Sequence, residues 1–133
     1  MPLKVDSFTP LLQVFDMRTS VAFYREILGF ELVMQSQAGD EFDWCLLKLN
    51  ESYLMLNTAY EKEFRPPRPE PARTVAHDDT GFFFNCPDVD AAYLHLQTIG
   101  IDAKPPKVAP YGMKQVYLKD PDGYVICLQH PTE

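Results

Sequence analysis

Cysteine is scarce in this chain, with only three cysteines among 133 residues. Cys45, Cys86 and Cys127 lie far apart, and none belongs to a C-x-x-C motif. An odd number of widely separated cysteines in apolar segments argues against the disulfide framework of small secreted proteins. The sequence therefore predicts free thiols and a reducing compartment.

Long apolar runs are absent as well. No stretch approaches the roughly 18 apolar residues that a membrane helix needs. The opening segment MPLKVDSFTP also lacks the apolar core of a signal peptide. We therefore expect a cytoplasmic protein without membrane contact.

Basic residues are outnumbered, with 12 Lys and Arg against 19 Asp and Glu, for a net charge of −7. This charge repels phosphate backbones and anionic membranes, so nucleic acid is not an expected partner. Apolar residues make up 46% of the chain and aromatic residues 13%, which is typical of a folded globule.

Familiar catalytic motifs are missing. The sequence has no G-x-S-x-G elbow, no glycine-rich phosphate loop and no H-E-x-x-H motif. The three histidines, His77, His95 and His130, are scattered, and we expect them on the surface. A general-base role for His77 would need a geometry that a flexible stretch rarely holds.

What the chain does contain is an internal repeat. Residues 9–29 and 81–100 both run from an apolar strand through a turn ending in Asp to an amphipathic helix closed by Gly. Asp16 and Asp88 are 72 residues apart, and Gly29 and Gly100 are 71 apart. Two apolar strands around a tight turn follow each helix, at 44–57 and 114–129. We expect two modules, about 7–58 and 80–130, that pack into a single domain, since each is too small to be stable alone.

Local signals place the elements of each module. Residues 11–15 read as a strand, and Asp16 or Thr19 can cap the next helix, whose predicted buried stripe includes Val21 and Tyr24. Residues 89–99 read as the second helix, with Ile99 in its stripe. Residues 30–35, 44–49 and 53–57 read as strands, and residues 120–123, Asp-Pro-Asp-Gly, favour a type I turn.

The linker between the modules, about residues 60–79, has neither a helical nor a strand period and is rich in proline. So long a connection is uncommon in a compact domain. We expect it to be an irregular tether, or a lid in which Tyr60 and Phe64 would touch a ligand.

These residues carry a family resemblance. The first module contains the pattern V-x-D-x-x-x-S-x-x-F-Y-x-x-x-L-G-F, and the second has D-x-D-A-A from Asp88, then Tyr111-Gly112-Met113 and a closing D-P-D-G-Y. This pattern resembles the vicinal oxygen chelate superfamily, which groups glyoxalase I, bleomycin-resistance proteins and extradiol dioxygenases. The resemblance implies an α+β fold in which two tandem βαβββ modules form a curved mixed sheet around a cleft.

The resemblance also implies where a divalent metal would be held, on the first and last strands of each module. Those positions fall on Thr9, Met55, Gly81 and Cys127. None is a carboxylate or an imidazole, the groups that such ions require. We therefore expect no metal and no other cofactor.

Without a metal, the cleft would be lined by aromatic and soft side chains. Our candidate ligand-binding residues are Phe42, Trp44, Met55, Phe82, Phe84, Tyr111, Met113 and Tyr117. Such a lining binds flat or apolar molecules. Metal-free relatives of the family sequester drugs as dimers, so we expect a homodimeric, metal-independent small-molecule binding protein. An acidic rim at Asp40, Glu41 and Asp43 would favour aromatic or cationic ligands.

Two other classes of function stay open at this point. One is an enzyme: a glyoxalase-like isomerase or lyase, or a dioxygenase, with its metal elsewhere, or a metal-free enzyme that uses Tyr111 or Cys127. The other is a structural or protein-interaction role, favoured only by the proline-rich linker.

Overall fold

The computed structural model describes residues 2–132 and divides the chain into two compact units, Met1–Arg68 and Pro69–Glu133. The boundary between the units falls inside the segment predicted to be the linker. Each unit contains one four-stranded mixed sheet and short helices, so the predicted α+β class is confirmed. Within residues 2–132, no helix combines the length and the apolar character needed to cross a membrane.

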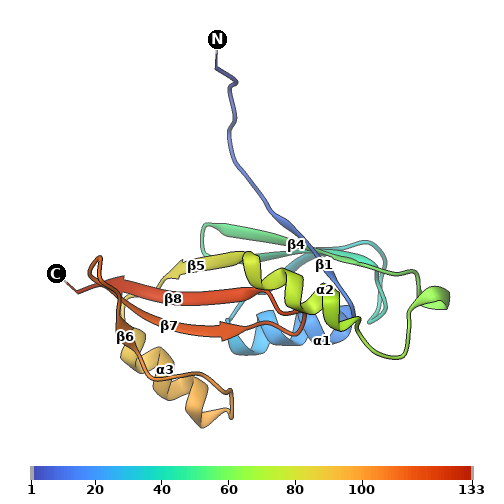
Figure 1. The fold of residues 1–133 in the computed structure, drawn as a ribbon. Coiled ribbons are helices and arrows are strands. Elements are labelled where there is room, and N and C mark those ends of the chain that lie inside the picture. The colour runs from blue at the N-terminus through green and yellow to red at the C-terminus, as the bar shows by residue number, and fades with distance from the viewer. Residues whose placement is uncertain (1, 133) are drawn as a thin grey trace. The chain divides into compact units, whose positions relative to one another are not determined.

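The first unit follows the predicted order of strand, helix and three strands (Figure 1). Its elements are β1 (Leu11–Val14), α1 (Met17–Ala22), η1 (Phe23–Ile27), β2 (Glu31–Gln35), β3 (Trp44–Leu49), β4 (Ser52–Thr58) and η2 (Lys62–Phe64). The sheet order is β1-β4-β3-β2, with β1 parallel to β4 and the other pairs antiparallel.

The second unit repeats this topology. Its elements are α2 (Pro71–Ala76), η3 (His77–Asp79), β5 (Gly81–Asn85), α3 (Val89–Thr98), β6 (Lys107–Val108), β7 (Met113–Lys119) and β8 (Val125–Pro131). The sheet order is β5-β8-β7-β6, again with one parallel pair, β5 and β8. The structural duplication agrees with the sequence repeat.

Aspartate caps begin the main helix of both units. Asp16 accepts hydrogen bonds through Oδ1 from the backbone N–H groups of Arg18 and Thr19, at 3.1 and 3.4 Å. Asp88 accepts one from Ala91 at 3.0 Å. These bonds satisfy N–H groups that have no partner inside the helix, which explains why each helix starts where it does.

The covered side of each sheet holds the core of its unit. Tyr24 is fully buried in the first unit and packs edge-on against Phe23 and Phe30. In the second unit, α3 lies along β7 and β8 and buries Val89 and Leu96 (Figure 1). Ile99 does not join this core as predicted, because the helix ends at Thr98 and leaves Ile99 42% exposed.

The linker differs from the prediction, because three short helices, η2, α2 and η3, form within it. Helix α2 is held against the turn at residues 120–123. Arg73 Nη1 lies 2.9 Å from Asp122 Oδ1, and the His77 ring stacks on Tyr124 with centroids 3.9 Å apart. His77 Nδ1 also donates to the Asp122 carbonyl at 2.7 Å. Contacts with residues 122 and 124 therefore order α2 and η3. Such contacts between distant parts of the chain produce no helical or strand periodicity in the sequence.

Two other predicted features of the second unit have definite structural roles. Asp120 accepts backbone N–H bonds from Asp122 and Tyr124, both at 2.9 Å, which closes the predicted turn. His130 accepts the Val89 backbone N–H through Nδ1 at 3.2 Å. His77 and His130 thus serve the fold and are not free surface residues.

The contact between Gly123 and α2 generates a prediction. Gly123 and Gly100 both have positive φ, +88° and +81°, so alanine at either site is strained by about 1 kcal/mol. A Cβ at Gly123 would also overlap the Thr74 carbonyl, whereas a Cβ at Gly100 meets nothing within 4 Å. We expect Gly123→Ala to lower the free energy of unfolding by about 1–3 kcal/mol more than Gly100→Ala. Chemical denaturation of both variants measures the difference, and equal losses would contradict the docking of α2 on this turn.

Candidate functional site

The sheet of each unit has a covered face and an open face, because side chains alternate along a strand. In the second unit, Phe82 and Phe84 pair with the buried Ile126 and Leu128 on the covered face. Alternate residues make up what we call the second open face: Phe83, Asn85, Met113, Gln115, Tyr117, Cys127 and Gln129.

The centre of the second open face is a thiol beneath two aromatic rings. Strand register places Cys127 between Phe83 on β5 and Tyr117 on β7. The two rings meet edge-to-face with centroids 6.2 Å apart. Cys127 is fully buried, but Phe83 and Tyr117 are 52% and 46% exposed. The rings therefore offer an apolar surface to a ligand, and the thiol does not.

A hydrogen-bonded network adjoins these rings. Tyr117 Oη donates to Gln115 Oε1 at 3.2 Å. Gln115 Nε2 donates to Tyr111 Oη at 2.9 Å and to Gln129 Oε1 at 3.0 Å. Gln115 is buried, with 6% of its surface exposed, and holds together polar groups from β7, β8 and the turn before β7. The second open face thus combines an aromatic surface with directed polar groups.

The chemistry of this face favours neutral groups. Burial raises the pKa of the Cys127 thiol, although the nearby Tyr117 hydroxyl partly opposes this effect. Desolvation also raises the pKa of Tyr117, and its neighbours Cys127 and Tyr111 add to the shift. The thiol and the phenol therefore keep their protons at neutral pH. A protonated, buried thiol is a poor nucleophile, so this geometry argues against nucleophilic catalysis by Cys127.

The first open face has the same plan, because the same strands pair in the same register. Leu11 pairs with Met55, as Phe83 pairs with Cys127, and Gln13 pairs with Asn57, as Asn85 pairs with Gln129. Trp44 and Leu46 of β3 complete this face opposite Asn57 and Met55. Both open faces therefore have an apolar centre with amide side chains to one side.

The predicted ligand-binding residues fall in several places. Trp44 and Met55 are on the first open face, and Met113 and Tyr117 are on the second, where Tyr111 joins through Gln115. Phe82 and Phe84 point to the covered face, one position away from the exposed Phe83. Phe42 is 9% exposed and lines a separate pocket of the first unit.

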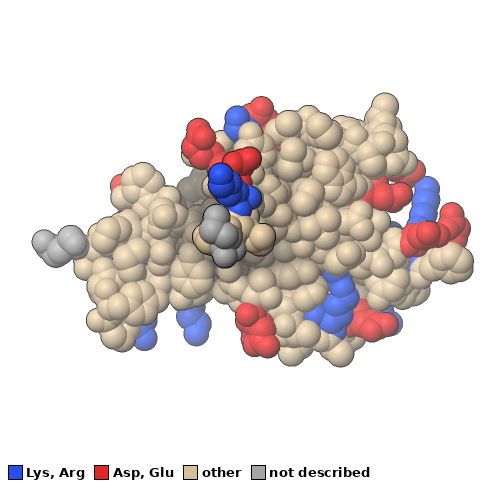
Figure 2. Space-filling view, turned by 90° about the horizontal axis from the view of Figure 1, so that it is seen from above, with Lys and Arg blue, Asp and Glu red and all other residues tan. Residues whose placement is uncertain are grey.

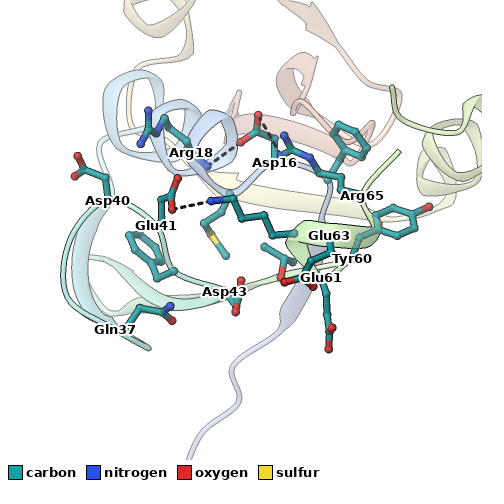
Figure 3. Close-up of a pocket in the computed structure, with 15 residues that line it drawn as sticks. Asp16, Arg18, Gln37, Asp40, Glu41, Asp43, Tyr60, Glu61, Glu63 and Arg65 are labelled. Carbon is teal, nitrogen blue, oxygen red and sulfur yellow. Dashed lines mark hydrogen bonds and ion pairs between the residues drawn. The ribbon is translucent and has the colours of Figure 1, made fainter. Parts of the chain in front are cut away.

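That pocket, about 590 Å³ in volume, lies among the start of α1, the segment before β3 and the segment around η2 (Figure 3). The predicted rim residues Asp40, Glu41 and Asp43 all line it. A second hollow of about 720 Å³ shares Arg18, Asp40 and Phe42 with it. The acidic rim therefore belongs to a pocket of the first unit and lies on neither open face.

Basic side chains from the linker already engage acids of this pocket. Lys62 Nζ lies 3.1 Å from Glu41 Oε2, and Arg65 Nη1 lies 3.7 Å from Asp16 Oδ2 (Figure 3). The Arg65 guanidinium also lies 5.2 Å from the centre of the Phe15 ring. Tyr60 packs edge-on against Phe15, so of the two predicted lid residues it is Tyr60 that lines the pocket, and Phe64 is 73% exposed.

Comparison with known proteins identifies the family. Residues 4–128 match the family model of the Glyoxalase/Bleomycin resistance protein/Dioxygenase superfamily. The chain belongs to this superfamily. It is 33% identical over 110 residues to YaeR of Escherichia coli K12, an uncharacterized protein, with 81% of this chain and 82% of YaeR covered.

Solved structures share the fold of this superfamily member. TnmS3, an antibiotic-binding protein from Streptomyces sp. CB03234, is 25% identical with a TM-score of 0.69, and 98% of this chain and 99% of TnmS3 are covered. A bleomycin-binding protein, solved in complex with bleomycin, is 22% identical with a TM-score of 0.68, and 95% of this chain and 98% of that one are covered.

The residues at the metal positions implied by the family do not fit a divalent metal. Thr9 and Met55 supply a hydroxyl and a thioether in the first unit, and in the second unit Gly81 has no side chain and Cys127 is a buried neutral thiol. Hard ions need oxygen ligands such as carboxylates, and a zinc site needs three or four protein ligands, of which only Cys127 could supply one here. Over residues 2–132, no group of three or more His, Cys, Asp and Glu side chains is arranged to hold a metal ion.

Sequence reasoning missed Phe83, Gln115 and Gln129. Phe83 is 72 residues after Leu11, so the repeat offset could have assigned it to the same face once Leu11 was placed. Residues 82–84 are all apolar, so no alternation of polar and apolar side chains shows which of them faces the core. Only the strand pairing decides that. Nothing in the sequence marked Gln115 and Gln129 as site residues, because they become hydrogen-bond partners only when β7 pairs with β8.

Burial of the thiols leads to a labelling prediction. Cys45 and Cys127 are buried, and desolvation raises the pKa of Cys45 from 9.0 to about 11, whereas Cys86 is partly exposed. At neutral pH we expect a disulfide reagent to modify Cys86 quickly and the other two slowly in native protein, because the thiolate is the reacting form. Absorbance at the reagent's product band measures this.

Cys86→Ser serves as the control and should remove the fast phase, and all thiols present should react after denaturation. Rapid modification of Cys127 in the native Cys86→Ser variant would contradict the assignment of a neutral, covered thiol and would revive a nucleophilic role.

Proposed function

We propose that this superfamily member is a metal-independent small-molecule binding protein. The ligand is an aromatic compound, neutral or cationic, held against an open sheet face. The observation that carries the proposal is the second open face, where half-exposed Phe83 and Tyr117 rings adjoin the Gln115 network. An aromatic ring stacked there gains about 0.5–1.5 kcal/mol beyond the area it buries.

The donor set supports binding without a metal. The metal positions that the family resemblance implies fall on Thr9, Met55, Gly81 and Cys127, and the last of these pairs with the aromatic Phe83. A site that replaces metal ligands by apolar groups is suited to burying ligand surface. TnmS3, an antibiotic-binding protein, and the protein solved in complex with bleomycin share this fold, which supports such a use.

The net charge of −7 supports neutral or cationic ligands over anionic ones. The acids Asp40, Glu41 and Asp43 beside the first unit's pocket add to this bias. They are exposed or paired with lysine, so they raise the rate of encounter more than the affinity, and their effect falls with added salt.

We propose further that the protein works as a homodimer in the cytoplasm. Apolar side chains such as Leu11 and Phe83 are exposed on the open faces, and exposed apolar patches often mark an interface. Broad areas without charged side chains are visible in Figure 2. Three free thiols suit a reducing compartment.

Substitution of an open-face ring tests the binding site. We expect Phe83→Ala to weaken the binding of planar aromatic compounds by roughly tenfold, because it removes a stacking surface. Phe8→Ala is the matched control, since Phe8 is 84% exposed but lies outside both sheets. Isothermal titration with a panel of bicyclic and tricyclic aromatics measures both.

Thermal unfolding of both variants checks that the fold is kept. Equal affinities of Phe83→Ala and Phe8→Ala for every bound compound would remove the second open face from the proposal. Light scattering that gives the 15.3 kDa mass of a single chain at micromolar concentration would contradict the homodimer.

A further inference from the structure

The hydrogen bonds of the Gln115 network run in a defined direction from donor to acceptor. The central amide can donate only through its nitrogen and accept only through its oxygen. Its oxygen is the atom that faces Tyr117, so the Tyr117 proton is used inside the network. Its nitrogen faces Tyr111 Oη and Gln129 Oε1, so both of these oxygens accept. Both hydrogens of the Gln115 amide are thereby used.

Cys127 favours this direction over the reverse. In the opposite arrangement, Tyr117 would accept from Gln115 and turn its own proton toward the neighbouring Cys127 sulfur. A neutral sulfur is a weak acceptor, so that arrangement would exchange an O–H···O bond for a weaker one. The thiol itself donates to the Leu128 carbonyl at 3.9 Å, so it does not need the Tyr117 oxygen as a partner.

The direction decides which groups are left for a ligand. Tyr111 accepts from Gln115 and also interacts with the Tyr117 hydroxyl, but it is 68% exposed, so its O–H can turn toward a ligand. Gln129 also accepts through its oxygen, so its N–H₂ group is available. Both residues contact the same Gln115 nitrogen, which places these two donors close together. The outer side of the network therefore offers paired hydrogen-bond donors.

We propose that the second open face recognises planar aromatic ketones and amides, whose carbonyl oxygen accepts from Tyr111 and Gln129 while the ring stacks on Phe83. The inference deepens the proposed function and rests on it. An anionic acceptor such as a carboxylate would also match two donors, but the net charge of −7 disfavours it, which selects a neutral carbonyl. Gln115 is the positioning residue, since it sets the direction of the donors without meeting the ligand.

Matched ligand pairs test the inference. We compare 9-fluorenone with fluorene and 1-indanone with indane, which differ by the carbonyl oxygen. Native protein should bind each ketone roughly tenfold more tightly than its hydrocarbon, the worth of about one net hydrogen bond. Tyr111→Phe, which removes only the hydroxyl, should reduce this ratio substantially.

Gln115→Glu tests the direction itself. A carboxylate at this position can only accept, so it would draw the Tyr111 and Gln129 donors inward and abolish the ketone preference. The carbonyl stretch of bound 9-fluorenone gives a readout that a purely structural role would not move. It should shift to lower wavenumber in native protein and return toward the unbound value in Gln115→Glu.

The outcomes separate the two proposals. Equal affinity for ketone and hydrocarbon in native protein would overturn this inference and leave the aromatic binding site standing. The same holds for a ketone preference that survives both Tyr111→Phe and Gln115→Glu. Binding of neither member of any pair would overturn the proposed function at this face, and the present inference with it.

Discussion

The parallel pairing between the first and last strands of each module is the constraint on which the rest of the structure depends. It sets Leu11 beside Met55 in the first unit and Phe83 beside Cys127 in the second. A shift of one residue would exchange the open and covered faces of each sheet. The open-face residues of the first strands, Leu11, Gln13, Phe83 and Asn85, owe their position to this register.

With the strand register fixed, the residues at the open-face positions determine which groups the site can bind. At the metal positions that the family resemblance implies, the chain has a hydroxyl, a thioether, a glycine and a buried thiol. In place of metal ligands, the second open face has two half-exposed aromatic rings and a hydrogen-bond network centred on the buried Gln115. A buried, fully bonded amide of this kind rigidifies the polar groups around it, which reduces the entropic cost of ordering them on a ligand.

Much of the fold was predictable because its signals are local. The cap at Asp16 and the turn that begins at Asp120 act within a few residues, and the structure forms both as expected. Asp88, which the repeat places 72 residues after Asp16, caps the second helix in the same way. The site was less predictable. In the apolar run from Phe82 to Phe84 only pairing with β8 decides which rings are open, so the sequence pointed to Phe82 and Phe84 when Phe83 is the exposed one.

The linker was missed for a related reason. Helix α2 begins at Pro71, a residue suited to the first turn of a helix, but at six residues it is too short to be stable alone. Its contacts with the turn at residues 120–123 lie almost 50 positions further along the chain. A helix that is stabilised by such distant contacts need not show a helical periodicity in its own sequence.

Metal retention is the most direct test of the central claim that this superfamily member binds its ligand without a metal. The protein would be stripped with a chelator, reloaded separately with Ni²⁺, Zn²⁺, Mn²⁺ and Fe²⁺, desalted and submitted to elemental analysis. The donor set at Thr9, Met55, Gly81 and Cys127 predicts retention near zero for all four ions. Near-stoichiometric retention of any of them would contradict the account and move a metal-dependent enzyme to first place.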